Sequence, residues 1–423
     1  MKRLGSLLLS AFMVCGSAVS ASAEGFALFE WSARGNALGG AMVARADDAS
    51  AVAFNPAGIT QLPGTHLMGG MSGIVPSGKL TTYNSGTGVG SDTDIQDNYW
   101  LIPHGYATQQ LNDDLWLGMG MYTRFGLGVD YPEDWAGKYY MYTVGLKTVS
   151  FTPNLAYKVT DKLSVAAGPE IMALKFNTSK KINMGGLGEN DMALEGTSFG
   201  VGLNAGVHYK FDDQWSAGIS YKSQIKQKVE GDADFARQVG SPFLPAGSRL
   251  LDSDVHGTII LPDEVLFGML FKPTPKLGVE VGGVWTRWST YRSMNFYLSD
   301  PSGVVSKSPK KWRDAWRFNL GVEYALLDWM DVRAGYTYDQ SPINEDYPDY
   351  MVPSNDRQMY STGVGFKWDA WTLDLSYSYL TIKGRDYLAR GSNELKPGTI
   401  DILTGQASEG NSHIVGMSVG YSF

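Results

Sequence analysis

Cysteine is almost absent from this chain of 423 residues, in which Cys15 is the only one. It lies in an N-terminal stretch built like a secretory signal peptide: Lys2 and Arg3 come first, then an apolar run from Leu7 to Val14, then the small residues Ala21-Ser22-Ala23. We expect this stretch to be removed on export. The mature chain would then contain no cysteine, which excludes a fold held by disulfides.

Long apolar runs and an excess of positive charge are also missing. No segment approaches eighteen consecutive apolar residues, so the sequence predicts no membrane-spanning helix. The chain has 35 basic and 43 acidic residues and no basic stripe, which argues against a nucleic-acid partner. Glycine (51 residues), tyrosine (23) and tryptophan (12) are abundant instead. In an exported chain this composition predicts a β-barrel of the bacterial outer membrane.

The residue pattern from about Thr65 onward has a period of two, as in strands with two different faces. In Trp371–Leu380 the large apolar residues alternate with Thr, Asp and Ser, and Phe199–Phe211 repeats the scheme. In a membrane barrel the apolar face contacts lipid and the polar face lines the lumen. A soluble sandwich would show the same alternation, so the connections between strands have to decide.

Short and long connections alternate along the chain, as they do in outer-membrane barrels with short periplasmic turns and long outer loops. Counting strands between them predicts an all-β fold, a 14-stranded antiparallel transmembrane barrel with both chain ends on the periplasmic side. One strand, Asp254–Lys272, contains Pro262, which predicts a bulge or kink there. The short turns are expected near residues 112–114, 160–162, 212–214, 272–276, 326–328 and 369–370. The long loops are expected near residues 81–98, 125–145, 180–195, 231–253, 296–310, 340–356 and 383–411.

The last predicted strand, Ser412–Phe423, ends in an aromatic residue. Such an ending resembles the signal by which outer-membrane proteins are recognised for insertion. We therefore expect the barrel-insertion machinery to be a partner through Phe423. The surrounding outer-membrane lipid and lipopolysaccharide are expected partners as well, and we expect the chain to act as a monomer.

A short stretch before the first strand, Asp47–Ile59, carries helix-start residues and otherwise small side chains. Asp47 or Asp48 can cap a short helix, and Asn55 can cap another that begins at Pro56. Small residues such as Ala57 allow close packing of the backbone. We interpret this region as a compact plug inside the barrel; the alternative is a periplasmic cap outside the pore.

At this point the sequence resembles the FadL family, outer-membrane transporters of long-chain fatty acids and other hydrophobic compounds. The hatch motif of that family is similar to the Asp47-Asp48-Ala49 run followed by Asn55-Pro56-Ala57. The resemblance continues through Phe125–Tyr139 and Trp312–Gly321 to the aromatic C-terminus. It implies three parts: a signal peptide at 1–23, a small, partly helical N-terminal hatch at 24–64, and the barrel at 65–423.

The resemblance also implies a mechanism. Ligand is captured among the outer loops, passes to an apolar pocket above the hatch, and leaves sideways through a gap at a kink in the third strand. We expect that strand at Leu115–Arg124, with Gly118 and Gly120 as the residues at which it bends. Uptake would be passive, and the expected substrate is a long-chain fatty acid. The alternatives are aromatic or aliphatic hydrocarbons carried by the same architecture, or a general porin.

A fatty acid carboxylate needs a positively charged partner. Arg313 and Arg317 fall on the predicted luminal face of their strand and are the first candidates; Lys175 is a weaker one. The alternative is that the arginines pair with luminal acids such as Asp314 or Glu323.

Enzymatic activity is not expected. Residues Gly416–Gly420 fit the G-x-S-x-G pattern of serine hydrolases, but that pattern needs a strand–turn–helix, and here it lies within a predicted strand. No cofactor motif, metal-ligand set or energy-coupling motif is predicted either.

Overall fold

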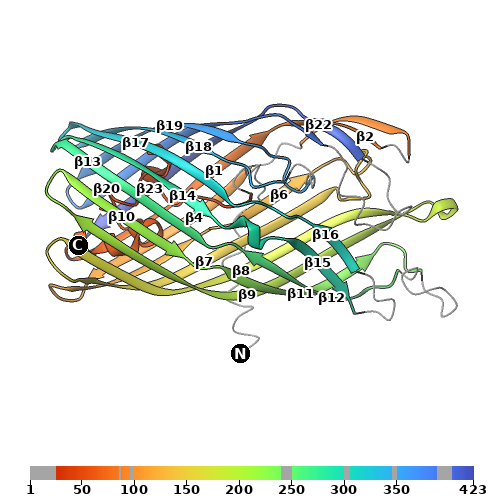
Figure 1. Ribbon diagram of the computed structural model, residues 1–423, viewed down its shortest axis with the longest axis horizontal. Coiled ribbons are helices and arrows are strands. Elements are labelled where there is room, and N and C mark those ends of the chain that lie inside the picture. The colour runs from red at the N-terminus through yellow and green to blue at the C-terminus, as the bar shows by residue number, and fades with distance from the viewer. Residues whose placement is uncertain are drawn as a thin grey trace.

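The computed structural model is a closed β-barrel with strongly tilted wall strands (Figure 1). It describes residues 25–84, 87–95, 99–239, 250–299, 305–344, 350–387 and 403–423, so the predicted signal peptide lies outside the described residues. The first wall strand pairs along its length with the last, β1 with β23, and this pairing closes the sheet.

Nine wall strands are continuous and five are divided into two segments, which confirms the prediction of fourteen. The continuous strands are β1 (Thr65–Ser77), β4 (Trp100–Gln110), β7 (Thr143–Lys158), β8 (Leu163–Asn183), β9 (Glu189–Lys210), β18 (Met330–Asp339), β19 (Arg357–Trp368), β20 (Trp371–Ile382) and β23 (Gly410–Ser422). The divided strands are β5 (Leu115–Tyr122) with β6 (Gly126–Asp130), β10 (Trp215–Lys222) with β11 (Ile225–Phe235), β12 (Ser253–Leu261) with β13 (Glu264–Thr274), β14 (Leu277–Thr286) with β15 (Ser293–Leu298), and β16 (Val305–Pro309) with β17 (Ala315–Leu327).

Side chains alternate between the outer surface and the lumen, as the period of two predicts. In β9, Phe199, Val201 and Leu203 are exposed by 59%, 68% and 64%, whereas Gly200 and Gly202 between them are buried. Such a band of exposed apolar side chains would be costly in water and is stable in lipid. The outer face of the wall is therefore the membrane-facing surface.

The two ends of the barrel differ as predicted. Short turns join consecutive strands at the end where the C-terminus lies, for example residues 111–114 between β4 and β5 (Figure 1). The opposite end carries the longer connections, including the β8–β9 hairpin with its short helix η2 (Gly185–Leu187). Short turns mark the periplasmic end of an outer-membrane barrel, so this opposite end is extracellular.

A separate four-stranded sheet covers part of the extracellular end. Its strands come from the first and the last long connections: β2 (Lys79–Asn84), β3 (Val89–Asp94), β21 (Arg385–Tyr387) and β22 (Leu403–Ala407). These two connections, far apart in the sequence, meet because β1 and β23 are neighbours in the closed wall.

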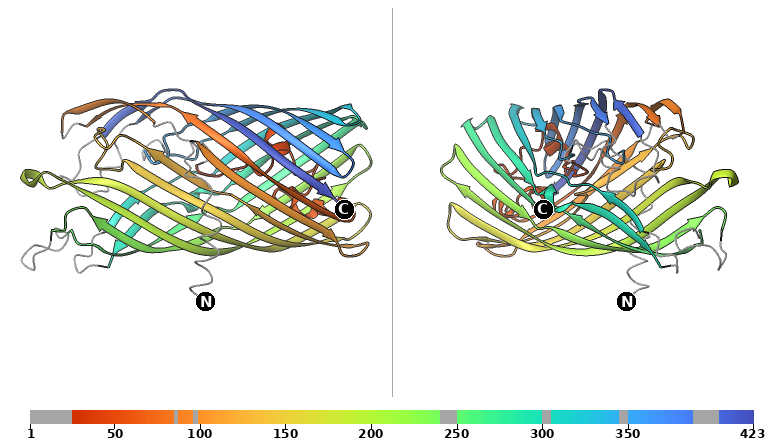
Figure 2. Two further views of the ribbon diagram at one scale, coloured as in Figure 1. Left: turned by 180° about the vertical axis from the view of Figure 1, so that it is seen from behind. Right: turned by 45° about the vertical axis from the view of Figure 1, so that its right-hand side comes forward.

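Residues 25–64, called the luminal segment here, fold inside the barrel toward its periplasmic end (Figure 2). They contain the short helices α2 (Ala33–Ala37) and α3 (Ala51–Phe54) and the 3₁₀ helix η1 (Pro56–Gln61), and nearly all of their residues are buried. Among the described residues, no helix has the length and apolar character needed to span a membrane.

Glycines on the inner wall make room for the luminal segment. A Cβ atom on Gly206 of β9 would overlap the side-chain oxygen of Asn55, and one on Gly218 of β10 would overlap the carbonyl oxygen of Val43. The small inward residues, which on their own suggest a water-filled lumen, are thus the complement of a packed plug.

The divided strands are interrupted at defined places. The eighth wall strand breaks at Pro262 and Asp263, between β12 and β13, as the proline predicts. The ninth contains the one-turn helix η3 (Trp288–Thr290) between β14 and β15, and the third breaks at residues 123–125. These interruptions lie where the luminal segment begins, which makes this level of the barrel the place to look for a site.

Candidate functional site: the luminal segment and the passage beside it

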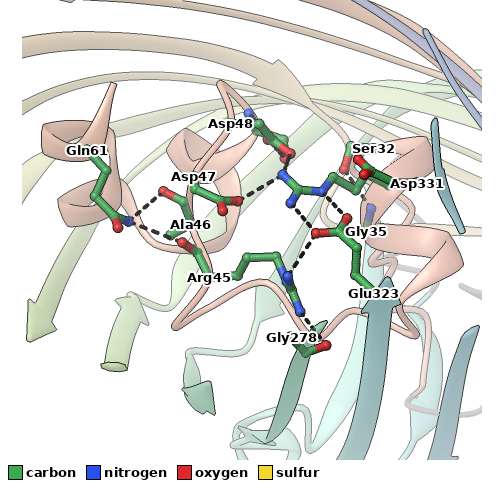
Figure 3. Close-up of polar contacts among 12 residues, drawn as sticks. Ser32, Gly35, Arg45, Ala46, Asp47, Asp48, Gln61, Gly278, Glu323 and Asp331 are labelled. Atoms are coloured by element: carbon green, nitrogen blue, oxygen red, sulfur yellow. Dashed lines mark hydrogen bonds and ion pairs between the residues drawn. The ribbon is translucent and has the colours of Figure 1, made fainter. Parts of the chain in front are cut away.

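Arg34 in α2 is the centre of an ion-pair network that ties the luminal segment to the wall. Its Nη1 lies 2.8 Å from Asp47 Oδ1 and 3.0 Å from Asp48 Oδ2, and its Nη2 lies 2.8 Å from Glu323 Oε1 in β17. Figure 3 labels Asp47, Asp48 and Glu323, and its dashed lines mark hydrogen bonds and ion pairs of this network. Both predicted hatch-motif aspartates therefore belong to one charged cluster.

Glu323 also binds two further arginines. Arg45 Nη1 lies 2.9 Å from Glu323 Oε1, and Arg333 Nε of β18 lies 2.6 Å from Oε2. Arg333 continues the network to Asp374 of β20, at 2.6 Å. A carboxylate shared by three guanidinium groups is strongly held, and its removal would leave buried cations without a partner.

The charge of Asp47 reflects this setting. Burial disfavours the ionised carboxylate, but attraction by Arg34, Arg45 and Lys272 outweighs burial and holds the pKa of Asp47 below its usual range. Asp47 is therefore ionised at neutral pH and contributes to the closed arrangement there.

Asp48 and Asn55 order the backbone of the segment. Asp48 Oδ1 accepts a hydrogen bond from the Ser50 N–H at 2.8 Å, just before α3, but the N-cap residue of this helix is Ser50 and neither aspartate. Asn55 caps η1 by accepting from the Ala57 N–H at 3.2 Å, with Pro56 as the first helical residue, as the sequence predicts.

Asn55 and the turn at residues 43–45 also hold the segment against the wall. The side-chain amide of Asn55 donates to the carbonyl oxygens of Val43 (2.9 Å) and Val207 (3.0 Å). The carboxylate of Glu280 in β14 accepts the N–H groups of Ala44 and Arg45, at 2.9 and 2.8 Å. The segment is thus bound to β9 and to β14 by buried hydrogen bonds.

An aromatic cage lies where the luminal segment begins. Phe26 packs with its ring centroid 4.8 Å from that of Trp288, 5.4 Å from Tyr291, 5.8 Å from Trp312 and 6.0 Å from Phe125. All five rings are buried. The wall thus forms a pocket for one aromatic ring, and Phe26 occupies it.

The third wall strand leaves an opening beside this cage. Within the described residues, the outer half of β4 pairs with β1 only, and β6 pairs with β7 only, so no ladder joins β4 to β6. The luminal segment bridges the edge of β6 instead: the Leu28 N–H donates to the Arg124 carbonyl at 2.7 Å, and the Gly126 N–H donates to the Phe26 carbonyl at 2.9 Å. The same residues that fill the cage thus cover this gap.

The strand breaks around the gap are joined by buried charges. Arg124, fully buried, lies 2.7 Å from Glu170 of β8 and 3.0 Å from Glu264 at the start of β13. The side chain therefore connects the third, fifth and eighth wall strands at the level of the gap.

The predicted bend at Gly118 and Gly120 is wrong, because both residues pair regularly with β4 and with β7 and the strand breaks beyond them, at residues 123–125. A Cβ on either glycine would crowd Val52 of α3. These glycines therefore admit the luminal segment, and the break comes from the unpaired stretch around Arg124.

A small amphipathic pocket with a cavity volume of about 20 Å³, partly open to solvent, lies next to Ala27 and Leu28. Its charged residues are a row of three directly opposed residues on adjacent strands, Arg317, Asp339 and Arg357, together with Glu30 of the luminal segment. Its apolar side is formed by Leu28 and by neighbouring strands of the wall: Ile74, Met359, Leu380 and Ile414. Trp100 and Ile102 on the inner face of β4 extend this apolar cluster to the edge of the gap.

Arg317 is a buried cation without an acidic partner. It is 5% exposed, its guanidinium stacks on Phe29 at 4.5 Å, and its Nε–H has no acceptor. Within the described residues it makes no ion pair, since Asp339 is bound by Arg357 and Glu323 by three other arginines. A buried cation of this kind favours an anionic ligand.

The other two predicted carboxylate partners lie elsewhere. Arg313 is exposed in the stretch before β17 and does not line the cavity. Lys175 shares its face of β8 with Ile171, on the outer surface, and lies 2.5 Å from Glu195 of β9. Of the three predicted residues, only Arg317 lines the pocket.

The G-x-S-x-G stretch lies within β23, paired regularly on both sides, so it forms no nucleophile elbow. Ser418 Oγ does meet His104 Nε2 at 2.8 Å, but it also accepts the Ala33 N–H, and helix α2 covers it. His104 Nδ1 is buried without a partner in the described part of the chain, so the group that orients a catalytic histidine is missing.

Sequence reasoning missed the cage residues Phe26, Trp288 and Tyr291, and it missed Arg124. Phe26 lies in the irregular start of the luminal segment, and the others lie in short irregular stretches between strand segments, where periodicity carries no information. The one usable signal was that Trp288 and Tyr291 lie three residues apart in the sequence outside any alternating pattern.

Comparison with known proteins places this architecture. The family model described as "Outer membrane protein transport protein (OMPP1/FadL/TodX)" matches residues 14–423. The chain is 27% identical to the 47 kDa outer membrane protein of Pasteurella multocida, over 99% of this chain and 98% of the relative. It is 25% identical to the long-chain fatty acid transport protein of Escherichia coli O6:H1, over 88% of this chain and 90% of the relative.

Among solved structures, the barrel is similar to the crystal structure of a Pseudomonas aeruginosa FadL homologue. The TM-score is 0.83, with 19% sequence identity, and the match covers 94% of this chain and all of the other. The family match over almost the whole chain and the shared fold agree. This protein is a member of the OMPP1/FadL/TodX family of transport proteins and lies in the bacterial outer membrane.

Proposed function

We propose that this protein carries long-chain fatty acids passively across the outer membrane. The observation that supports this most is Arg317, a buried cation without an ion-pair partner in the described chain, in a cavity whose other side is aliphatic. A fatty acid offers a carboxylate for the guanidinium and an alkyl chain for the apolar side. The fatty acid transport named for the Escherichia coli relative is consistent with it.

The proposed route uses the luminal segment as a gate. Ligand captured at the outer loops reaches the level of the cage and displaces Phe26, which sits in the space it needs. Because Phe26 and Leu28 also bridge the edge of β6, their movement opens the gap beside the third wall strand. The ligand then leaves sideways into the membrane, and the network around Arg34 keeps the rest of the segment in place.

A second candidate substrate is an aromatic hydrocarbon. The cage of Trp288, Tyr291, Trp312 and Phe125 already holds one benzyl group, that of Phe26. A small aromatic molecule would fit the same place without any use for Arg317. The two candidates therefore differ in their dependence on this arginine.

A general porin is the least supported candidate, because the luminal segment packs closely against the glycines of the inner wall and occupies the lumen there. The porin hypothesis predicts that the unaltered protein takes up small polar solutes.

The experiment is uptake of labelled oleate and labelled toluene by cells that lack their own outer-membrane transporters. Three forms are compared: the unaltered chain, Arg317→Gln, and Arg313→Gln as a matched control that removes an exposed charge four residues away. We expect Arg317→Gln to reduce oleate uptake at least tenfold and to leave toluene uptake unchanged. Equal oleate uptake by all three forms would contradict the fatty acid proposal; loss of both substrates would assign Arg317 a structural role.

A further inference from the structure

The outer wall carries positive charge at one level on one side of the barrel. Four lysines point outward there: Lys147 in β7, Lys175 in β8, and Lys226 and Lys228 in β11. Each alternates with buried neighbours, such as Leu146 beside Lys147, so the side chains lie on the membrane-facing surface. Their position does not serve the lumen, and the proposed transport leaves them without a role.

The four lysines lie at a common depth. Each is 11 to 13 residues from the periplasmic end of its own wall strand. At about 3.3 Å per residue and a tilt of about 40°, this distance is roughly 30 Å of height. The apolar band of such barrels is about 25 Å tall, and it begins here at the exposed aromatic residues of the periplasmic ends, Tyr157 and Tyr209. The lysines therefore lie just above it, at the headgroup level of the outer leaflet.

The positive charges of these lysines are only partly neutralised by acidic residues of the protein. Lys147 and Lys175 are directly opposed on neighbouring strands, which is unfavourable for like charges. Lys175 is compensated by Glu195 at 2.5 Å, but within the described residues Lys147, Lys226 and Lys228 make no ion pair. The outward residue two positions after Lys228 toward the cell exterior is Glu230, and Glu195 in β9 lies opposite Asn177, two positions beyond Lys175.

The layer is also local. On the far half of the wall, outward positions in the extracellular half of β19 and β20 carry aromatic residues, such as Tyr360 and Tyr379. Below the lysines lie large apolar side chains suited to acyl chains: Phe151, Ile171, Phe199 and Val201. Strand β9 lies between the lysine pairs of β7–β8 and of β11, so the pairs are about 10 Å apart across the strands and are also displaced along them, because Glu230 and not Lys228 is in line with Lys175.

We propose that this face, called the lysine face here, binds lipopolysaccharide, with the phosphates of its lipid anchor held by Lys147, Lys175, Lys226 and Lys228. A headgroup with two phosphates and several acyl chains matches two lysine pairs above an apolar surface. The extracellular position assigns the lipid to the outer leaflet, because the short turns and the C-terminus mark the opposite end as periplasmic. Phospholipids of the inner leaflet do not reach this level.

The test measures binding of purified diphosphoryl lipid A to the full-length mature protein in detergent, at low and at high salt. One variant replaces the four lysines with glutamine: Lys147→Gln, Lys175→Gln, Lys226→Gln and Lys228→Gln. The matched control removes four lysines at the periplasmic end: Lys158→Gln, Lys162→Gln, Lys210→Gln and Lys276→Gln. Heat-modifiable gel mobility shows that each barrel is folded, and if the first variant fails to fold, Lys226→Gln with Lys228→Gln takes its place.

We expect the lysine-face variant to bind diphosphoryl lipid A at least tenfold more weakly than the control, and dephosphorylated lipid A to bind every form weakly. For the double variant we expect a loss of at least threefold. Equal binding by variant and control would overturn the proposal. Phosphatidylglycerol that binds as tightly, with the same dependence on these lysines, would overturn the assignment to lipopolysaccharide.

Discussion

Glu323 in the wall and Arg34 in the luminal segment are joined by two hydrogen bonds, Arg34 Nη2 to Oε1 at 2.8 Å and Arg34 Nε to Oε2 at 2.9 Å. This bidentate contact connects residues 289 positions apart in the chain. Side-on pairing of a guanidinium and a carboxylate fixes orientation as well as distance. It is the point at which the plug is aligned with the barrel.

Replacement of Glu323 with glutamine should loosen the plug. The change leaves Arg34, Arg45 and Arg333 around a neutral amide, and breaking a buried ion pair from one side costs about 3 kcal/mol or more. We expect higher ion conductance of single barrels in planar bilayers, and greater sensitivity of cells to polar antibiotics. Glu189→Gln at the extracellular end of β9 is the control, and conductance equal to that of the control would show that Glu323 does not hold the plug.

The plug should also loosen in acid. The pKa of Asp47 is lower in the folded protein than in an unfolded chain, because Arg34 stabilises its ionised form despite burial. Its contribution is therefore complete above the ordinary aspartate pKa of about 4 and is lost as pH falls through the lower folded value. We expect conductance to stay low from pH 7 to pH 5 and to rise below pH 4. Asp47→Asn should leak already at pH 7; a variant with the same pH profile as the unaltered protein would refute this.

An added methyl group on the wall should displace the cap of η1. In Gly206→Ala, the new Cβ would overlap the Asn55 side chain and lie 3.0 Å from Pro56 Cδ. Overpacking of this kind costs about 1–3 kcal/mol. We expect a lower unfolding temperature in detergent and a measurable leak. Gly186→Ala in the outer hairpin is the matched control, because nothing lies within 4 Å of its added Cβ. Identical unfolding temperatures for the two variants would contradict the packing argument.

Removal of the Phe26 ring should empty the aromatic cage. Phe26→Ala is expected to destabilise the protein by about 3 kcal/mol, because the ring is buried among four others. The same change should tighten ligand binding severalfold, because a cage that is no longer self-occupied is available more of the time. Calorimetric titration with toluene and with oleate measures both affinities, with the lipid-facing Phe318→Ala as control. Weaker binding of both ligands by Phe26→Ala would show that Phe26 supports the site rather than competing for it.

The prediction that Phe423 is recognised by the barrel-insertion machinery stays a prediction. Phe423 is 72% exposed and packs its ring 4.7 Å from Tyr421, so it is accessible to an insertion partner. Recognition by the barrel-insertion machinery and the monomeric state are expectations that rest on the sequence resemblance.

The sequence by itself determined the wall. Alternation in stretches such as Phe199–Phe211 is sufficient because a strand has only two faces, and lipid on one side leaves one register for the apolar residues. The turns followed from their length and position, and Pro262 marked a break because proline cannot donate to a ladder. Asn55 and Pro56 predicted the start of η1 because a helix cap is formed by residues that are neighbours in the sequence.

The tertiary structure decided everything that depends on residues meeting across the lumen. Lys175 has the same charge as Arg317, but its side chain lies on the membrane-facing surface. In an irregular stretch such as 310–314, the sequence does not indicate which side chains face the lumen and which face outward. The break at Arg124 lies where the third wall strand stops pairing with β4, because β5 pairs with β4 and β6 does not. This pairing is a property of the closed sheet. Arg34 contacts Glu323, and Phe26 contacts Trp288, only after the fourteen strands have assembled and brought these distant segments together. Local sequence carries no record of such contacts, because their partners are chosen by closure of the barrel and by the space that glycines leave inside it.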